Sequence, residues 1–317
     1  MRKFILKVIL LGIITTLFAK MVYFVGDHIS EKVYGPNTKY QIEKSFENAL
    51  ASDASNWILG NSRIYRGLNP DMIDVSSWYN FAHDNDSYNQ MYYKLKYLLD
   101  HGCKIDTLVI GTDYFQFSNF SDTRNYVYDR LLGSDYIKDY NSFLPKEWLN
   151  NGKRYIITKQ GIISAIVLYI NNLVTTGGGT SLIELRKNGS YINDMGGGRE
   201  DDFTKRDSTM GDVQIRYYEQ ILELCKNEHI ELFVLMMPVR DNELKNYNNH
   251  FIEKFNDYIK ESLKANGFES HYIDMSNHLG FKDYRMYTDI THLNSQSADS
   301  YTKCFYKELV NKNKPIK

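Results

Sequence analysis

A serine near one end of the chain and an Asp-x-x-His segment near the other offer the residue types of nucleophilic catalysis. Ser62 lies in the stretch 57–63, and Asp289 and His292 lie in the stretch 287–294. Serine is a weak nucleophile at neutral pH and needs an adjacent base, and histidine titrates near neutrality. An Asp-x-x-His loop can fold back so that the carboxylate accepts from Nδ1, which leaves Nε2 to take the serine proton. The three residues could therefore form and release an acyl-serine.

Each motif also has a simpler interpretation. Ser62 could cap a following helix, Asp289 could stabilise a turn, and His292 could be a surface residue. Their joint positions favour chemistry, because the serine follows the first expected strand and the Asp-x-x-His segment follows the last, just before the final helix. In an open parallel sheet both loops lie at the same edge, where ligands bind.

The elements that would position these residues alternate between strands and helices. Apolar runs and three- or four-residue apolar spacings predict them. We expect strands at 56–59, 78–82, 106–111, 231–237 and 270–275, and helices at 41–54, 88–101, 213–227, 251–265 and about 295–310. Strand, helix, strand in this order predicts a parallel sheet with right-handed crossovers, and hence a three-layer α/β/α fold.

Residues 120–210 fit this pattern less well and are expected to be an insertion. An apolar segment at 154–174 is interrupted by Lys159 and Gln160, which favours a helix packed on the domain over a membrane span. The glycine triplets at 177–179 and 196–198 match no phosphate-binding loop. They are expected to be flexible loops, either a lid over the site or a surface excursion.

The N-terminus predicts a membrane anchor. Residues 4–26 are mostly apolar and long enough to cross a bilayer, and three basic residues, Arg2, Lys3 and Lys7, lie on the N-terminal side. The positive-inside rule then places the N-terminus in the cytoplasm and the rest of the chain outside. A cleaved signal peptide is the alternative, but cleavage after Ala19 would put Leu17 where a small residue is needed.

The expected organisation is a single-pass protein of the cytoplasmic membrane with an extracytoplasmic domain. It has an anchor at 1–26, a linker at 27–40 that contains Gly35-Pro36, and an α/β domain at 41–317. The net charge of −1 over 317 residues gives no support for nucleic-acid binding. The 26 tyrosines would suit stacking on sugars, or reflect composition bias. Three isolated cysteines, Cys103, Cys225 and Cys304, indicate neither a metal site nor disulfides, and no cofactor is expected.

The segments Gly60-Asn61-Ser62-Arg63 and Asp289-Ile290-Thr291-His292 resemble the first and last conserved blocks of SGNH hydrolases. The layout is most similar to the membrane-anchored branch that includes the D-alanyl-transfer protein DltD and the alginate-type polysaccharide O-acetylation proteins. The resemblance implies a flavodoxin-like SGNH sheet, with Ser62 as nucleophile, His292 as base and Asp289 as the carboxylate that orients it.

The middle blocks depart from that family. Many members place a glycine after the second strand and an asparagine after the third, as oxyanion donors, whereas this chain has 83–87 (His-Asp-Asn-Asp-Ser) and 111–113 (Gly-Thr-Asp). An ionised Asp113 cannot donate. Backbone N–H groups at Ser62 and in the Asp84–Asn85 loop, or the Asn85 amide, are expected to substitute. Arg63, Asn85 and Asp113 are thus the candidate oxyanion or substrate-binding residues.

Two arginines beside the serine, Arg63 and Arg66, could hold an acidic acceptor, or be solvated surface residues. The first hypothesis is an O-acyltransferase or esterase acting on a cell-envelope polysaccharide, with a membrane-bound acyltransferase as a possible source of acyl groups. The second is an inactive scaffold that keeps the fold and binds the polysaccharide or such an acyltransferase. The third is metal-dependent phosphoryl or sulfuryl ester hydrolysis, with a metal held by Asp113, Asp84 and Asp86.

Overall fold

The computed structural model divides the chain into two compact units. It describes residues 1–34, 39–73, 77–118, 121, 129–143, 167, 170, 184–185, 188–192, 197 and 208–312. The first unit comprises Met1–Lys44 and Tyr140–Ser181, and the second comprises Ser45–Asp139 and Leu182–Lys317. The domain limits predicted from the sequence stay a prediction.

The first unit holds helix α1 (Arg2–Tyr34), which extends into the stretch expected to be a linker. Within it, Lys3–Val22 is long and apolar enough to be a membrane span or a signal sequence. The glycine triplets expected to form loops, apart from Gly197, and the helix expected at 154–174, apart from positions 167 and 170, lie outside the described residues.

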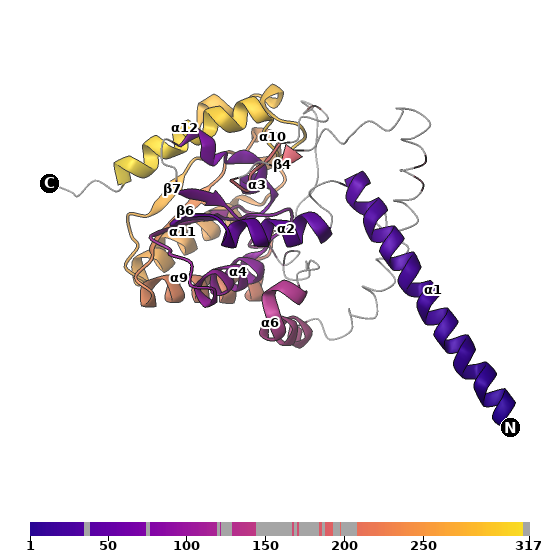
Figure 1. The fold of residues 1–317 in the computed structure, drawn as a ribbon. Coiled ribbons are helices and arrows are strands. Elements are labelled where there is room, and N and C mark those ends of the chain that lie inside the picture. Colours follow the sequence, from indigo (N-terminus) through magenta and orange to yellow (C-terminus); the bar gives the residue numbers. More distant parts are fainter. Residues whose placement is uncertain are drawn as a thin grey trace. The chain divides into compact units, whose positions relative to one another are not determined.

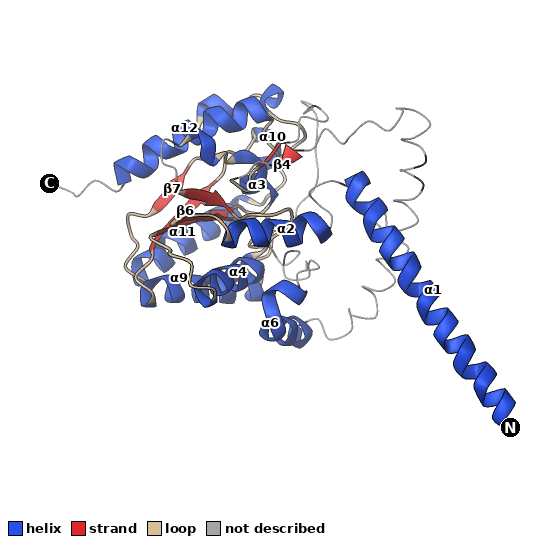
Figure 2. Ribbon diagram, viewed as in Figure 1, coloured by secondary structure: helices blue, strands red, loops and turns tan. Residues whose placement is uncertain are grey.

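The second unit is built on a five-stranded sheet, whose strands are drawn in red in Figure 2. Its strand order is β2-β1-β3-β6-β7, and every neighbouring pair is parallel. The strands are β1 (Asn56–Leu59), β2 (Trp78–Asn80), β3 (Thr107–Thr112), β6 (Glu231–Met236) and β7 (Tyr272–Asp274). This confirms the predicted α/β fold. The chain leaves β1 for β2 on one side and returns to β3 on the other, so the loops after β1 and β3 flank a topological switch point, where such sheets bind ligands.

Helices cover both faces of this sheet, with α3 and α12 on one face and α4, α9 and α11 on the other (Figure 1). The helices are α2 (Lys39–Leu50), α3 (Ser62–Gly67), α4 (Tyr88–Asp100), α6 (Asp129–Phe143), α9 (Asp212–Asn227), α10 (Asp241–Leu244), α11 (Asn249–Ala265) and α12 (Ser295–Lys312). Short 3-10 turns lie at Pro70–Met72, Leu279–Phe281 and Tyr284–Met286, and β4 (Glu184–Leu185) pairs antiparallel with β5 (Tyr191–Ile192).

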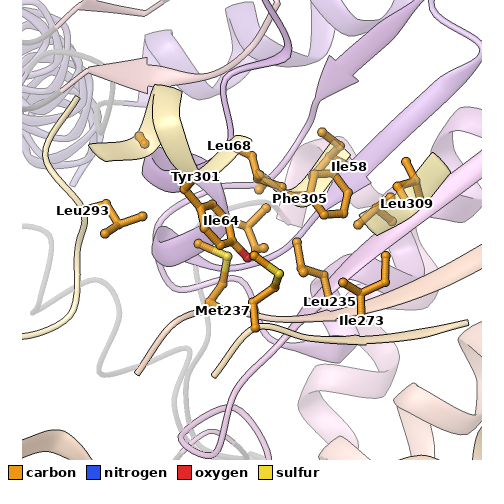
Figure 3. Close-up of a cluster of buried hydrophobic side chains, with 14 of the residues drawn as sticks. Ile58, Ile64, Leu68, Leu235, Met237, Ile273, Leu293, Tyr301, Phe305 and Leu309 are labelled. Carbon is orange, nitrogen blue, oxygen red and sulfur yellow. The ribbon is translucent and has the colours of Figure 1, made fainter. Parts of the chain in front are cut away.

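A hydrophobic cluster fixes α3 and α12 against the sheet (Figure 3). It joins buried side chains of the strands and of the two helices: Ile58, Leu235, Ile273, Ile64, Leu68, Tyr301, Phe305 and Leu309. The last three recur every four residues and so line one face of α12. Full burial of one such aliphatic or aromatic side chain contributes about 1.5–3 kcal/mol. The helix that begins at Ser62 is therefore held firmly.

Two glycines allow α3 to lie close to the strands. A methyl group on Gly60 or on Gly111 would overlap the side chain of Ile64. Because glycine has no Cβ, Ile64 fits directly over the ends of β1 and β3. The first turn of α3 is thereby fixed at the carboxyl edge of the sheet.

Several tyrosines belong to the core of the second unit. Tyr88, Tyr217, Tyr218 and Tyr301 are fully buried. The ring of Tyr88 contacts those of Phe117 and Tyr218 at centroid distances of 4.7 and 5.2 Å. The number of tyrosines therefore gives no support to sugar stacking.

Candidate active site

The turn at residues 60–63 carries the predicted nucleophile and is called the nucleophile turn below. It is capped by Asn61 and not by Ser62. Asn61 has an extended backbone, and its side-chain oxygen accepts from the N–H of Arg63 at 3.0 Å. Ser62 is the first helical residue of α3. The interpretation of Ser62 as the helix cap is therefore wrong. Because Asn61 already satisfies the exposed N–H of the helix end, the hydroxyl of Ser62 is available for another partner.

That partner is His292. The Oγ of Ser62 lies 2.7 Å from Nε2 of His292, across 230 positions of sequence. The other ring nitrogen, Nδ1, lies 2.6 Å from Oδ2 of Asp289. The structure thus brings together the three residues that the sequence analysis selected, at the carboxyl edge of the sheet.

A small closed loop holds the histidine and the carboxylate. Tyr287 and Leu293 form an antiparallel bridge, and the N–H of Thr288 donates to the carbonyl of His292 at 2.8 Å. Inside the loop, Oδ1 of Asp289 accepts from the N–H groups of Thr291 and His292 at 2.8 and 2.9 Å. The carboxylate is thereby fixed to the backbone by one oxygen and to the imidazole by the other.

The surroundings of Asp289 keep it ionised. Burial alone would raise the pKa of Asp289, but the hydrogen bonds and the attraction from His292, together with the two backbone N–H groups, hold that pKa well below its ordinary value. Its side chain is 46% exposed and that of His292 is 15% exposed. An ionised carboxylate on Nδ1 leaves Nε2 as the nitrogen that can accept a proton from Ser62.

The loop after β2 lies beside this site. The ring of His83 stacks on Tyr65 of α3 at a centroid distance of 5.0 Å. Arg66 donates to Asp84 through Nε at 3.2 Å and through Nη2 at 2.6 Å. Burial would raise the pKa of Asp84, but Arg66, His83 and His292 lower it. The N–H of His83 also donates to the carbonyl of Gly60 at 3.2 Å, which places this loop beside the turn that carries Ser62.

A second ion pair holds the far side of the same loop. Nζ of Lys94 lies 2.6 Å from Asp86 and donates to the carbonyl of Phe81 at 2.8 Å. Between the two pairs, Asn85 adopts a φ of 67°. That left-handed conformation is uncommon for residues other than glycine, although asparagine tolerates it. The two ion pairs therefore fix an unusual turn in the loop that contacts Gly60.

This turn and the start of α3 present backbone donors. In the part of the chain that the structure describes, the N–H groups of Ser62, Asp84 and Asn85 have no hydrogen-bond partner. Such donors can stabilise an oxyanion if they face the reacting carbonyl. Asn85 stays the predicted donor of this loop, through its backbone or its amide.

Two of the predicted oxyanion or substrate-binding residues belong to a buried cluster instead. Arg63 is 6% exposed; its Nη2 bonds to Glu243, and its Nε lies 3.3 Å from Asp113. Asp113 also accepts from Asn61 Nδ2 at 2.6 Å and from the N–H of Gln116 at 2.7 Å. The prediction that Arg63 and Arg66 are solvated is wrong, because both pair with carboxylates. Asp113 anchors the nucleophile turn as an acceptor.

The hypothesis of a shared metal does not fit these pairings. Asp84 pairs with Arg66, Asp86 pairs with Lys94, and Asp113 pairs with Arg63. Three carboxylates that face three different cations do not converge on one ion. Among the described residues, no three His, Cys, Asp or Glu side chains are placed to hold a metal.

Sequence reasoning missed the charged residues that complete this site, Glu243, Arg240 and Lys94. All three are 1–2% exposed, although Arg, Lys and Glu are seldom so deeply buried. A buried pair such as Arg63 with Glu243 joins positions 180 residues apart. No local pattern signals such a partner.

No family model matches the chain, and no curated protein matches it. A solved structure described as "a putative platelet activating factor from Streptococcus pneumonia" is 11% identical, with 91% of this chain and 99% of that chain covered and a TM-score of 0.42. Similarity at this level carries no argument about function, which must be inferred from the geometry of the site.

Proposed function

We propose that the protein is a serine-dependent acyl-ester enzyme, an O-acyltransferase or an esterase, of the SGNH type that its two motifs resemble. The observation that supports this most is the continuous contact from Ser62 Oγ to His292 Nε2 at 2.7 Å and from His292 Nδ1 to Asp289 at 2.6 Å. A nucleophile, a base and an orienting acid in this order are the parts that acyl transfer through serine requires.

The reaction follows from these positions. Ser62 Oγ attacks the acyl carbon while Nε2 of His292 takes its proton, and Asp289 stabilises the imidazolium. Collapse of the tetrahedral intermediate breaks the ester bond, and the departing alcohol takes the proton from His292. Water or a sugar hydroxyl then attacks the acyl-serine with His292 again as base, which releases the acid or the new ester and restores Ser62.

The developing oxyanion would be held by the N–H groups of Ser62 and of the Asp84–Asn85 turn. These groups have no partner within the described residues, and the turn is fixed by two ion pairs. A single lost donor typically costs about 2.7–4 kcal/mol of transition-state stabilisation. The position of this turn should therefore have a strong effect on kcat.

Replacing Arg66 with methionine tests this role. Without the guanidinium, Asp84 loses its bidentate partner and the turn should shift away from the nucleophile. We expect kcat for p-nitrophenyl acetate to fall by about 100- to 1,000-fold, the loss typical of one oxyanion donor. Lys104→Met, which breaks an exposed ion pair with Asp106, is the matched control and should keep full activity. Unchanged kcat in Arg66→Met would remove this turn from the oxyanion hole.

A serine-directed fluorophosphonate separates an enzyme from an inactive scaffold. The reagent should add covalently to wild-type protein and to Ser300→Ala, which changes an exposed serine of α12, but not to Ser62→Ala. Intact-protein mass measures the addition. Wild-type protein without Ser62-dependent addition would favour the scaffold, whose motivation is that the loops 83–87 and 111–113 differ from the oxyanion blocks of SGNH hydrolases.

The setting proposed for this chemistry is the outer face of the cytoplasmic membrane, with a cell-envelope polysaccharide as acceptor or substrate and a membrane-bound acyltransferase as acyl source. The support is the apolar segment Lys3–Val22, the basic residues Arg2, Lys3 and Lys7 at its N-terminal end, and the resemblance to membrane-anchored O-acetylation proteins. A C-terminal reporter that is active only outside the cytoplasm should be active on the full chain. Activity confined to a cytoplasmic reporter would contradict this topology.

A further inference from the structure

A single helical turn after β6 carries two buried charges of opposite sign. Arg240 precedes α10 (Asp241–Leu244) as its N-cap, and Glu243 lies three positions later. Both are 2% exposed. Buried charges are costly unless they are paired, so the partners of these two side chains show what the turn is built to hold.

Glu243 contacts the nucleophile side of the site. It bonds to Nη2 of Arg63, the residue after Ser62. Arg63 in turn lies 3.3 Å from Asp113, which holds the side chain of Asn61, the residue before Ser62, at 2.6 Å. Burial disfavours the guanidinium charge, but Glu243 and Asp113 together raise the pKa of Arg63 above its ordinary value. Both neighbours of the serine are therefore fixed by buried charged groups: Arg63 by Glu243 and Asp113, and Asn61 by Asp113.

Arg240 contacts the base side of the site. Its Nη1 donates to the carbonyl of Asp289 at 3.4 Å, and its guanidinium lies 5.6 Å from the centroid of the Tyr287 ring. The second distance is within the range of a cation–π contact. Tyr287 is itself fixed, since it is 3% exposed and donates its hydroxyl to the carbonyl of Phe281 at 2.7 Å. Arg240 therefore contacts the loop that carries His292 at two residues, Tyr287 at its start and Asp289.

We infer that Arg240 and Glu243 are positioning residues. They fix the nucleophile turn and the loop Tyr287–Leu293, which carries His292, at the correct distance from each other. The inference rests on the proposed function. Neither side chain needs to touch substrate, because Glu243 acts through Arg63 and Arg240 acts through Tyr287 and the backbone carbonyl of Asp289. Ser62 and His292 are 230 positions apart in the sequence, so their alignment depends on how the two loops pack. A displacement of about 1 Å between reacting groups can cost about 100-fold in rate.

The test compares Glu243→Gln and Arg240→Gln with Asp241→Asn in the full chain. The two glutamines keep much of the side-chain volume and remove the charge. The control removes a charge from the same turn, where Asp241 is 75% exposed and pairs with Lys282 at 3.2 Å. We expect kcat for p-nitrophenyl acetate to fall about 10- to 100-fold in both glutamine variants with KM unchanged, and no change in the control. Arg240→Lys, which keeps the cation beside Tyr287, should recover part of the loss.

A second readout does not depend on turnover. The Nδ1 proton of His292, shared with Asp289, gives an NMR resonance that reports the geometry of that pair. It should shift in Glu243→Gln and Arg240→Gln and stay in place in Asp241→Asn. Active-site titration with the fluorophosphonate gives the fraction of competent protein, so that kcat is expressed per working site.

The outcomes separate the two proposals. Wild-type kcat per working site and an unmoved resonance in both glutamine variants would overturn the positioning role and leave the proposed function intact. Reduced thermal stability with unchanged kcat per site would also overturn it, because the residues would then be merely structural. Wild-type protein without Ser62-dependent turnover would instead overturn the proposed function, and the resonance alone would then decide whether the two residues set the geometry of the Asp289–His292 pair.

Discussion

Ser62→Ala should lower kcat for p-nitrophenyl acetate hydrolysis by about 10⁶-fold, the loss seen when the nucleophile of a serine triad is removed. Alanine cannot form the acyl intermediate, and His292 loses the hydroxyl that lies 2.7 Å from its Nε2. The fold should be unaffected, because Asn61 and not Ser62 caps α3. The residual hydrolysis rate is measured in end-point assays at high protein concentration. Thermal unfolding, measured in parallel, checks the fold.

His292→Ala gives an internal check on the same prediction. Nucleophile and base act as one unit, so the double variant should be no slower than either single variant. Ser300→Ala changes an exposed serine of α12 and should behave as the wild type. Ser62→Ala protein that keeps wild-type turnover would remove the proposed nucleophile, whereas additive losses would show that Ser62 and His292 act separately.

The sheet and the position of the site could be predicted because they depend on local patterns. Strand β1 occupies the expected residues, and β3 and β6 lie within a residue or two of the expected ends, since strands buried on both faces are continuous apolar runs. Parallel order then places every loop that follows a strand at one edge of the sheet. Ser62 follows β1 and the Asp-x-x-His loop follows β7, so the topology predicts that both lie at this edge.

The charged surroundings of the site could not be predicted in the same way. Whether Arg63 points to solvent or to Glu243 depends on how α3 and α10 pack, and the two residues are 180 positions apart. Composition favours exposed arginine and glutamate, which led to the wrong expectation of solvated arginines. The alternative that Ser62 caps the helix could not be rejected from the sequence, because Asn and Ser cap helices almost equally well and the true cap, Asn61, is the neighbouring residue.

The loops 83–87 and 111–113, which differ from the SGNH blocks, have structural roles of their own. Asp113 lies where many SGNH hydrolases, which the two motifs resemble, place an oxyanion donor. Here it accepts from Asn61 and pairs with Arg63, and so supports the turn that carries Ser62. The loop after β2 has no glycine, yet Asn85 reaches the left-handed conformation with an ion pair on each side. In this chain, two ion pairs hold the left-handed turn at Asn85, a conformation that glycine adopts more readily.

Asp289→Asn should lower kcat by about 10⁴-fold, the effect of replacing the orienting carboxylate of a triad with its amide. An amide nitrogen facing Nδ1 would favour the tautomer that carries its proton on Nε2, and that nitrogen could no longer accept from Ser62. The fluorophosphonate reaction should slow in parallel. Asp283→Asn is the matched control, because it removes an aspartate paired with exposed Arg285 from the same stretch before α12.

The pH dependence of stability offers an independent check on Asp289. Its pKa in the folded chain is depressed, below the value of about 3.9 for an unfolded aspartate. The folded state therefore gains stability from this carboxylate above about pH 4, and the gain is lost as the pH falls through the folded-state pKa. Asp289→Asn should be less stable than the wild type at neutral pH, and the two should converge in acid. A difference in stability that does not depend on pH, combined with nearly normal kcat, would show that Asp289 holds only the turn and that His292 is oriented by another group.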